Sequence, residues 1–240
     1  MHSPKPSLRI YPHLLQACFR QTPRISGARR RTWQFMATEN AHPQGGPVDP
    51  HVLGLTAAEF RKLRPSPSGK PFDKVVVGAA IIRHAAASGP GDVKTPTILL
   101  LKRAAHEIYY PDVFELPSGK VDPEDRSIRD ALAREVHEET GLEVADVVAE
   151  LQPMVYETTR TVTDGAGLES SVTKSAIQLN YVVSVAGDAE DGVTLRPEEH
   201  SESCWATETV AGTLDVTALM MEVVREAFRW VSRSSHTKLV

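Results

Sequence analysis

The segment Arg134–Leu142, with the sequence REVHEETGL, constrains this chain more than any other stretch. Its glutamates Glu135, Glu138 and Glu139 are spaced i, i+3 and i+4, so a helix would place them on one face. Like charges at these spacings cost an isolated helix roughly 0.2–0.5 kcal/mol per pair. A divalent cation would remove that cost. A ligand set of carboxylates without Cys or clustered His indicates Mg²⁺, with Mn²⁺ as the alternative. The plainer interpretation is an acidic helix face turned to solvent.

The flanking residues favour the metal site. Gly141 follows Thr140 as a helix stop, and Arg134 is placed to lie beside the carboxylates and orient one of them. Upstream, 116–121 is typical of a short strand that breaks into a loop, and 122–125 leads into the helix. The predicted order is therefore strand, loop, helix, stop.

In these features the chain resembles the Nudix hydrolase family. The family signature is a glycine, a loop, an acidic residue and then a helix reading Arg-Glu-apolar-x-Glu-Glu-x-Gly-apolar. Every fixed position from Arg134 to Leu142 matches. The first half departs from the pattern: Gly119 and Asp125 keep the usual spacing, but the interval from Asp125 to Arg134 has one extra residue and aspartate replaces glutamate. We expect a turn to absorb the extra residue, because the metal face begins only at Glu135.

The resemblance implies a fold, a cofactor and a reaction. The fold would be an α/β/α sandwich with a mixed β-sheet, and strands flanked by helices over 73–233 agree with it. The reaction would be metal-dependent hydrolysis of a pyrophosphate bond in a nucleoside diphosphate linked to another group, such as ADP-ribose, a nucleotide sugar or a modified nucleotide. The Mg²⁺ or Mn²⁺ ligands would be Glu135, Glu138, Glu139 and the carbonyl of Gly119, with Arg134 as an orienting catalytic residue.

Hydrolysis also needs a general base to take the proton of the attacking water. The family uses either a glutamate of the signature, here Glu135, or one in a later loop. In this chain Glu198, Glu199 and His200 lie in such a loop, just before an expected strand at 204–206. We favour Glu199, although the same three residues are also typical of an exposed acidic loop.

Substrate contacts are less constrained by the sequence. Arg103 and Lys120 could neutralise phosphates by direct charge contact, and Lys102 is a further option. Cations at strand ends are otherwise simply solvated. The aromatic group Tyr109, Tyr110 and Phe114 could stack on a base or serve only in packing.

Two other classes of function stay open. A Nudix-fold module could bind a nucleotide or a protein without hydrolysis, although the retained glutamates and Arg134 favour an enzyme. An RNA-processing pyrophosphatase would need a basic groove. The acidic balance of 39–240 argues against an extended nucleic-acid partner, though not against a short cap-like end. The expected partners are a nucleotide-type small molecule and, as an open alternative to a monomer, a second copy of the chain in a homodimer.

Charge divides the chain into two parts. Residues 1–38 contain seven of the 27 basic residues and no acidic one, while the remainder carries all 31 acidic residues. This acid-free segment resembles a mitochondrial transit peptide, and the alternative is a basic tail. Met36 would serve as an internal start that yields a cytoplasmic form. No stretch reaches the ~20 apolar residues of a membrane span, and Cys18 and Cys204 provide no disulfide framework.

The remaining segments are predicted from local patterns. Residues 39–72 are typical of a linker, with one short helix that starts at the capping box Thr56–Glu59 and runs to about Leu63. Strands are expected at 74–83, 97–103, 151–162 and 173–185, the last two forming a long hairpin. A helix capped by Asp215, with an apolar stripe from 216 to 231, ends the domain before a tail at 234–240.

Overall fold

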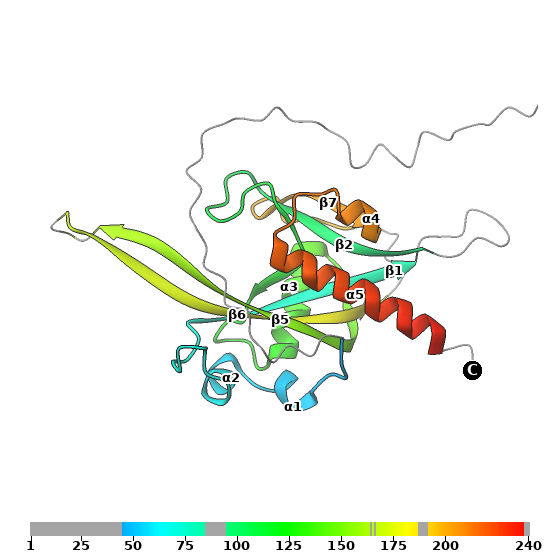
Figure 1. The fold of residues 1–240 in the computed structure, drawn as a ribbon, viewed down its shortest axis with the longest axis horizontal. Coiled ribbons are helices and arrows are strands. Elements are labelled where there is room, and N and C mark those ends of the chain that lie inside the picture. The colour runs from blue at the N-terminus through cyan, green and yellow to red at the C-terminus, as the bar shows by residue number, and fades with distance from the viewer. Residues whose placement is uncertain (1–44, 85–94, 164, 166, 187–191, 238–240) are drawn as a thin grey trace, which may run out of the picture. The chain divides into compact units, whose positions relative to one another are not determined.

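The computed structural model describes residues 45–84, 95–163, 165, 167–186 and 192–237 (Figure 1). The predicted N-terminal segment 1–38, including Met36 and Cys18, lies outside the described residues. The strands are β1 Lys74–His84, β2 Pro96–Arg103, β3 Phe114–Glu115, β4 Ser118–Lys120, β5 Val144–Thr163, β6 Glu169–Val185 and β7 His200–Ala206. The helices are α1 Pro50–Leu53, α2 Ala57–Leu63, α3 Ile128–Thr140, α4 Glu208–Ala211 and α5 Ala218–Thr237.

The strands form a mixed sheet around β1. The order along the sheet is β3-β2-β1-β6-β5, with β4 also paired to β1 and β7 to β2. β1 runs parallel to β6 from Lys74 to Ile81 and antiparallel to β2 and β4. Near its end, β2 lies between β3 and β7. This arrangement brings β4 and the start of β7, which are far apart in the sequence, to the same region of the sheet.

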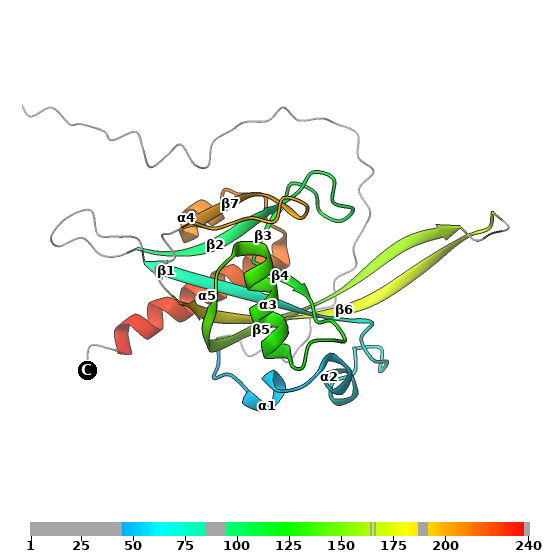
Figure 2. The ribbon, with the colours of Figure 1, turned by 180° about the vertical axis from the view of Figure 1, so that it is seen from behind.

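Helices cover both faces of the sheet. Figure 1 shows α5 in front of the strands, and the reverse view in Figure 2 shows α3 in front with α5 behind. The predicted α/β/α sandwich with a mixed sheet is therefore confirmed.

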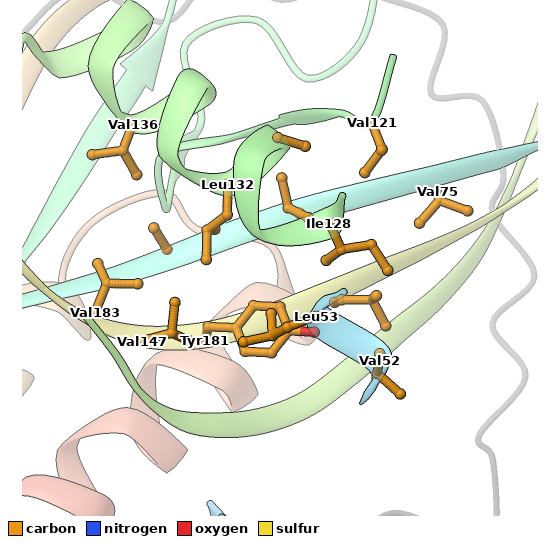
Figure 3. Packing of buried hydrophobic residues seen from close by; sticks show 14 of the residues in the cluster. Val52, Leu53, Val75, Val121, Ile128, Leu132, Val136, Val147, Tyr181 and Val183 are labelled. Atoms are coloured by element: carbon orange, nitrogen blue, oxygen red, sulfur yellow. The ribbon is translucent and has the colours of Figure 1, made fainter. Parts of the chain in front are cut away.

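The core between α3 and the sheet is apolar and closely packed. Figure 3 shows Ile128, Leu132 and Val136 of α3 pointing toward strand residues, among them Tyr181 and Val183 of β6. The three helix residues are spaced by four, so one stripe of α3 is buried. The opposite side of the helix is thereby left for polar residues.

The ends of α3 follow the sequence signals. The Ser127 side chain caps the first turn by accepting from the Asp130 N–H, and Gly141 ends the helix with φ 72°, as the predicted stop requires. Between β4 and α3 the chain turns at 122–125, where the Asp125 N–H donates to the Asp122 carbonyl. The extra residue of the loop is accommodated in this connection, and α3 itself is regular.

The β5–β6 hairpin is longer than predicted, because β5 starts at Val144 rather than near 151. Its register shifts between Leu151 and Met154. At this irregularity the Gln152 N–H donates to the buried Glu226 carboxylate of α5. The Gln152 carbonyl accepts from the Asn180 side chain. Side chains therefore satisfy the backbone groups that the interrupted ladder releases.

The expected linker at 39–72 needs correction for its described part. The predicted capping box of Thr56 and Glu59 is present and starts α2. Helix α1, whose first turn is capped by Asp49, was not predicted from the sequence. Val52, Leu53 and Phe60 are buried in the main hydrophobic cluster, so the segment is part of the domain core. A four-residue helix is too short to show a period, which is why composition suggested a linker.

The C-terminal helix is confirmed with a different start. Thr217, not Asp215, caps the first turn of α5, because its hydroxyl accepts from the Met220 N–H. The Asp215 carbonyl instead accepts from the Phe114 N–H of β3. The predicted apolar stripe is core, with Val223, Val224 and Ala227 among its buried residues. No helix in the described part of the chain combines the length and apolar composition needed to cross a bilayer.

Candidate functional site

The candidate site lies where the C-terminal half of α3 faces β4 and the loop before β7. Asp125 and Arg134 form its frame. Arg134 donates from Nε to Asp125 Oδ1 at 2.9 Å and from Nη2 to Asp125 Oδ2 at 2.8 Å, and Nη2 also donates to the Lys120 carbonyl at 3.1 Å. The Arg134 hydrogen bonds hold the pKa of Asp125 below its usual value. The one-residue insertion has therefore not separated the acidic position from its arginine.

The third Arg134 nitrogen contacts two of the helical glutamates. Nη1 lies 2.9 Å from Glu135 Oε1 and 3.4 Å from Glu138 Oε2. A second arginine, Arg196, lies 3.3 Å from both Glu138 Oε2 and Glu199 Oε1. The two arginines thus fix Glu138 to the frame on one side and to the loop before β7 on the other.

Gly119 lies directly against Glu135. A Cβ built on Gly119 would come within 2.1 Å of the Glu135 carboxylate, closer than any side chain allows. Burial raises the pKa of Glu135, although the neighbouring Arg134 guanidinium opposes that rise. The predicted pair of Gly119 and Glu135 is therefore in contact, and it depends on the absence of a side chain at 119.

Glu139 is the most deeply buried acid of the site, with 2% of its surface exposed. Its Oε2 accepts from the Ser118 N–H at 2.9 Å. Burial raises its pKa well above the usual value, and the charges of Glu115, Glu135 and Glu199 raise it further. A carboxylate in such surroundings is costly unless it is protonated or paired with a cation.

The loop before β7 brings two more potential metal ligands close to Glu139. In the part of the chain that the structure describes, Glu139, Glu199 and His200 each offer one atom that could bind a metal ion, and these three atoms lie within 4.8 Å of one another. Such a grouping is not found for the three helical glutamates in the described residues, since Glu135 and Glu138 turn toward Arg134. The loop is held in place because the Ala104 N–H donates to the Glu199 carbonyl at 2.8 Å.

The residues present suit a divalent cation. Carboxylates from α3, β3 and the loop converge, and Glu139 is buried among them with a backbone N–H as its hydrogen-bond donor. The backbone at Gly119 also lies close to the Glu135 carboxylate, because position 119 carries no side chain. Oxygen donors of this kind are those that Mg²⁺ and Mn²⁺ prefer.

The two predicted substrate-binding cations differ in their surroundings. Arg103 is held by three groups: Nε donates to the Tyr109 carbonyl at 2.8 Å, Nη1 to Glu115 at 2.6 Å and Nη2 to Glu107 at 2.9 Å. Lys120 is about half exposed, and its Nζ lies 2.9 Å from Asp122 Oδ1. Arg103 therefore organises the β2–β3 loop, while Lys120 is open to solvent.

Both cations line a pocket of about 270 Å³ beside the acidic cluster. Its wall includes Ser118, Gly119 and Glu115, so it opens onto the same region as Glu139. The aromatic residues Tyr109, Tyr110 and Phe114, which the sequence suggested as stacking or packing groups, line this pocket together with the following residues: Tyr156, Met154, Leu219 and Met220. Burial raises the pKa of Tyr156 to about 12, so its hydroxyl stays protonated.

Two residues beside the site were not predicted from the sequence, Arg196 and Tyr156. Arg196 lies far along the chain from the signature. Tyr156 lies in a predicted strand, and no local pattern marks it as a pocket residue. His200 was considered only as a candidate base, because its place beside Glu139 depends on the pairing of β7 with β2.

A family model described as NUDIX domain matches residues 79–231, more than half of the chain. Among curated proteins, an uncharacterized Nudix hydrolase NudL from Enterobacter sp. (strain 638) is 37% identical over 75 residues, which cover 30% of this chain and 39% of that relative. The chain thus matches well under half of that relative's length.

Solved structures are similar only at a general level. A C. elegans Ap4A hydrolase has a TM-score of 0.45 and 20% identity, covering 66% of this chain and 98% of its own. A MutT protein from Methanosarcina mazei Go1 has a TM-score of 0.42 and 24% identity, covering 65% of this chain and 94% of its own. With the matched domain model and the signature residues in place around Arg134, the chain belongs to the Nudix family.

Proposed function

We propose that this protein is a metal-dependent hydrolase that cleaves a pyrophosphate bond in a nucleoside diphosphate linked to another group. The substrate classes are ADP-ribose-like compounds, nucleotide sugars and modified nucleotides. The observation that carries the proposal is the buried Glu139 carboxylate, surrounded by Glu115, Glu135 and Glu199 beside an aromatic pocket. Glu135 and Glu139 are buried, and Glu115 and Glu199 are partly buried beside them. A fold has no structural need for such a cluster of acids, so a cation and a phosphate group explain it best.

Each residue has a proposed task. Glu135, Glu138, Glu139 and the Gly119 carbonyl would hold Mg²⁺ or Mn²⁺. Such an ion, when bound, neutralises phosphate oxygens and lowers the pKa of a water molecule. Arg134 orients Glu135 and Glu138 through its own hydrogen bonds.

Glu199 is the proposed general base, with Glu135 as the alternative. It lies within 4.8 Å of Glu139, and the anchored loop holds it at the acidic cluster. A carboxylate there can accept a proton from a water molecule that attacks phosphorus.

The pocket would receive the nucleoside end of the substrate. Tyr109, Tyr110 and Phe114 provide aromatic surface for a base, and Lys120 at the rim is placed to contact a phosphate. Arg103 would contact a phosphate only if the substrate displaced Glu107 from Nη2.

The alternative is a binding module that does not hydrolyse its ligand. The ion pairs of Arg134 and Arg196 with Glu138 favour it, because they compete with a cation for that carboxylate. A phosphate-release screen separates the two functions. Dinucleotides, nucleotide sugars and modified triphosphates are each tested with Mg²⁺ and with Mn²⁺, and ligand binding is measured in parallel by calorimetry.

The variant Glu139→Gln should lose turnover in that screen, whereas Glu124→Gln, at an exposed position of the β4–α3 loop, should retain it. Binding of a nucleotide without product formation under all conditions would reject the hydrolase and support the binding module. Hydrolysis that continues unchanged in Glu139→Gln would reject the assigned site.

We further propose, from sequence alone, that residues 1–38 direct the protein to mitochondria and that initiation at Met36 gives a cytoplasmic form. Sizing of the N-terminus in protein from isolated organelles and from cytosol tests this. A homodimer is a separate proposal, which light scattering after size exclusion tests.

A further inference from the structure

His200 is a buried side chain that the proposed reaction does not yet use. It has 3% of its surface exposed, and within the described residues neither ring nitrogen has a hydrogen-bond partner. The nearest acid is Glu115, whose Oε1 lies 3.6 Å from Nε2. That oxygen already accepts from Arg103 at 2.6 Å. An imidazole buried without hydrogen bonds is costly, so the ring needs another partner.

The ring is directed at the acidic cluster. One of its nitrogens lies within 4.8 Å of carboxylate oxygens of both Glu139 and Glu199. Opposite ligands on an ion with bonds of about 2.1 Å are about 4.2 Å apart. A small adjustment of the three side chains would therefore place all three donors around one cation.

The position is also fixed by the backbone. The His200 N–H donates to the Arg196 carbonyl at 2.9 Å, and His200 pairs with Arg103 of β2. Arg196 in turn contacts Glu138 and Glu199. The loop, β2 and α3 thus hold the imidazole and the carboxylates in one arrangement before any ion binds.

We propose that Glu139, one oxygen of the Glu199 carboxylate and His200 form a cation position with a nitrogen ligand, which leaves the second Glu199 oxygen for the proposed role as base. This position would take Mn²⁺ or a similar first-row transition ion in preference to Mg²⁺. Imidazole suits transition ions, whereas Mg²⁺ prefers oxygen donors and water. The inference rests on the proposed function in that both need a cation at Glu139, but it concerns which ion binds there and through which atom.

Pulsed electron paramagnetic resonance of the full chain with Mn²⁺ alone tests the nitrogen ligand directly. The expected spectrum shows ¹⁴N modulation from a coordinated imidazole, which changes to the ¹⁵N pattern when the protein is made with ¹⁵N-labelled histidine. Absence of this coupling in the wild-type complex overturns the proposal, whether or not any variant folds.

Two variants identify the residue. His200→Gln should lose the ¹⁴N modulation, and His51→Gln, at an exposed position of α1, should keep it. Titration calorimetry should show that the preference for Mn²⁺ over Mg²⁺ falls about tenfold or more in His200→Gln. An unchanged preference would overturn the proposal. If no divalent ion binds the wild type at all, the proposed hydrolase fails too; if an ion binds without nitrogen coupling, only the His200 inference fails.

Discussion

The Asp125 carboxylate accepts hydrogen bonds from both Nε and Nη2 of Arg134, at 2.9 and 2.8 Å, in a bidentate ion pair. Asp125 Oδ2 also accepts from the Asp122 N–H at 2.8 Å, so the aspartate joins the turn of the loop to the arginine of the helix. The aspartate at position 125, which is shorter than the usual glutamate, and the extra residue between 125 and 134 therefore still allow the Asp125–Arg134 ion pair to form. Arg134, held in this way, is positioned beside Glu135 and Glu138.

Replacement of Asp125 should therefore loosen the frame. Asp125→Asn removes the charge and one acceptor, and we expect a loss of about 1–3 kcal/mol in the free energy of unfolding at pH 7. The folded-state pKa of Asp125 lies below the ordinary value of 3.8, so this stability is present above 3.8 and disappears as pH falls through the folded-state value. Urea unfolding of both proteins at pH 7 and near pH 3 checks this; an equal difference at both pH values would contradict it.

Gly119→Ala should impair the site without unfolding the protein. The added Cβ would meet the Glu135 carboxylate, which must then move away from the metal position. We expect metal affinity to fall by roughly 10–100-fold, as for other disturbances of a ligand's support. Gly46→Ala is the matched control, because nothing lies within 4 Å of a Cβ there. Calorimetric titration with Mn²⁺ makes the comparison, and equal affinities of the two variants would contradict the assignment.

Glu138→Gln should stop turnover while leaving the fold intact, because the Glu138 side chain is partly exposed, at 36%, and lies between Arg134 and Arg196. We expect kcat to fall by about 100-fold or more with Mg²⁺. Glu143→Gln, at an exposed residue whose carboxylate lies beside His137 and away from the acidic cluster, should retain the rate. Circular dichroism confirms the fold. A rate equal to wild type would remove Glu138 from the site.

Glu139→Gln should make the metal-free protein more stable. Because burial raises the pKa of Glu139 in the folded state, the wild type loses stability as pH rises from 4.5 through that raised value. Glutamine avoids this loss and can still accept from the Ser118 N–H. At pH 7 without metal we expect a higher Tm, by about 2–4 °C for each kcal/mol gained.

Added Mn²⁺ should then raise the Tm of the wild type but not that of Glu139→Gln. Thermal scans with and without the ion, with Glu124→Gln as the control, measure both effects. A lower Tm of the metal-free variant would contradict the cost assigned to the buried carboxylate.

The irregularity in β5 gives a prediction away from the site. Glu226→Leu would leave the Gln152 N–H without its acceptor, and we expect about 1–3 kcal/mol of lost stability. Glu226→Gln keeps an acceptor oxygen and should stay close to wild type. Chemical unfolding of the two variants decides, and equal losses would show that the hydrogen bond is not the cause.

Local sequence patterns determined most of the helices and strands of this protein and the acidic face of α3. The spacing of Glu135, Glu138 and Glu139 predicted the acidic side of α3, and Gly141 predicted its end. The capping box predicted the start of α2, and the apolar runs predicted the strands β1 and β2. These features depend on residues within a few positions of one another, so helix and strand periodicity is enough to predict them.

Only the tertiary structure decided how the site is completed. Glu199 and His200 lie about sixty residues beyond Glu139 in the chain, and they reach it because β7 pairs with β2 in a particular register. The same pairing sets Arg196 between Glu138 and Glu199 and leaves Arg103 bound to Glu107 and Glu115. Strand register between distant segments is set by the packing of the whole sheet, and a local pattern in the sequence does not contain it.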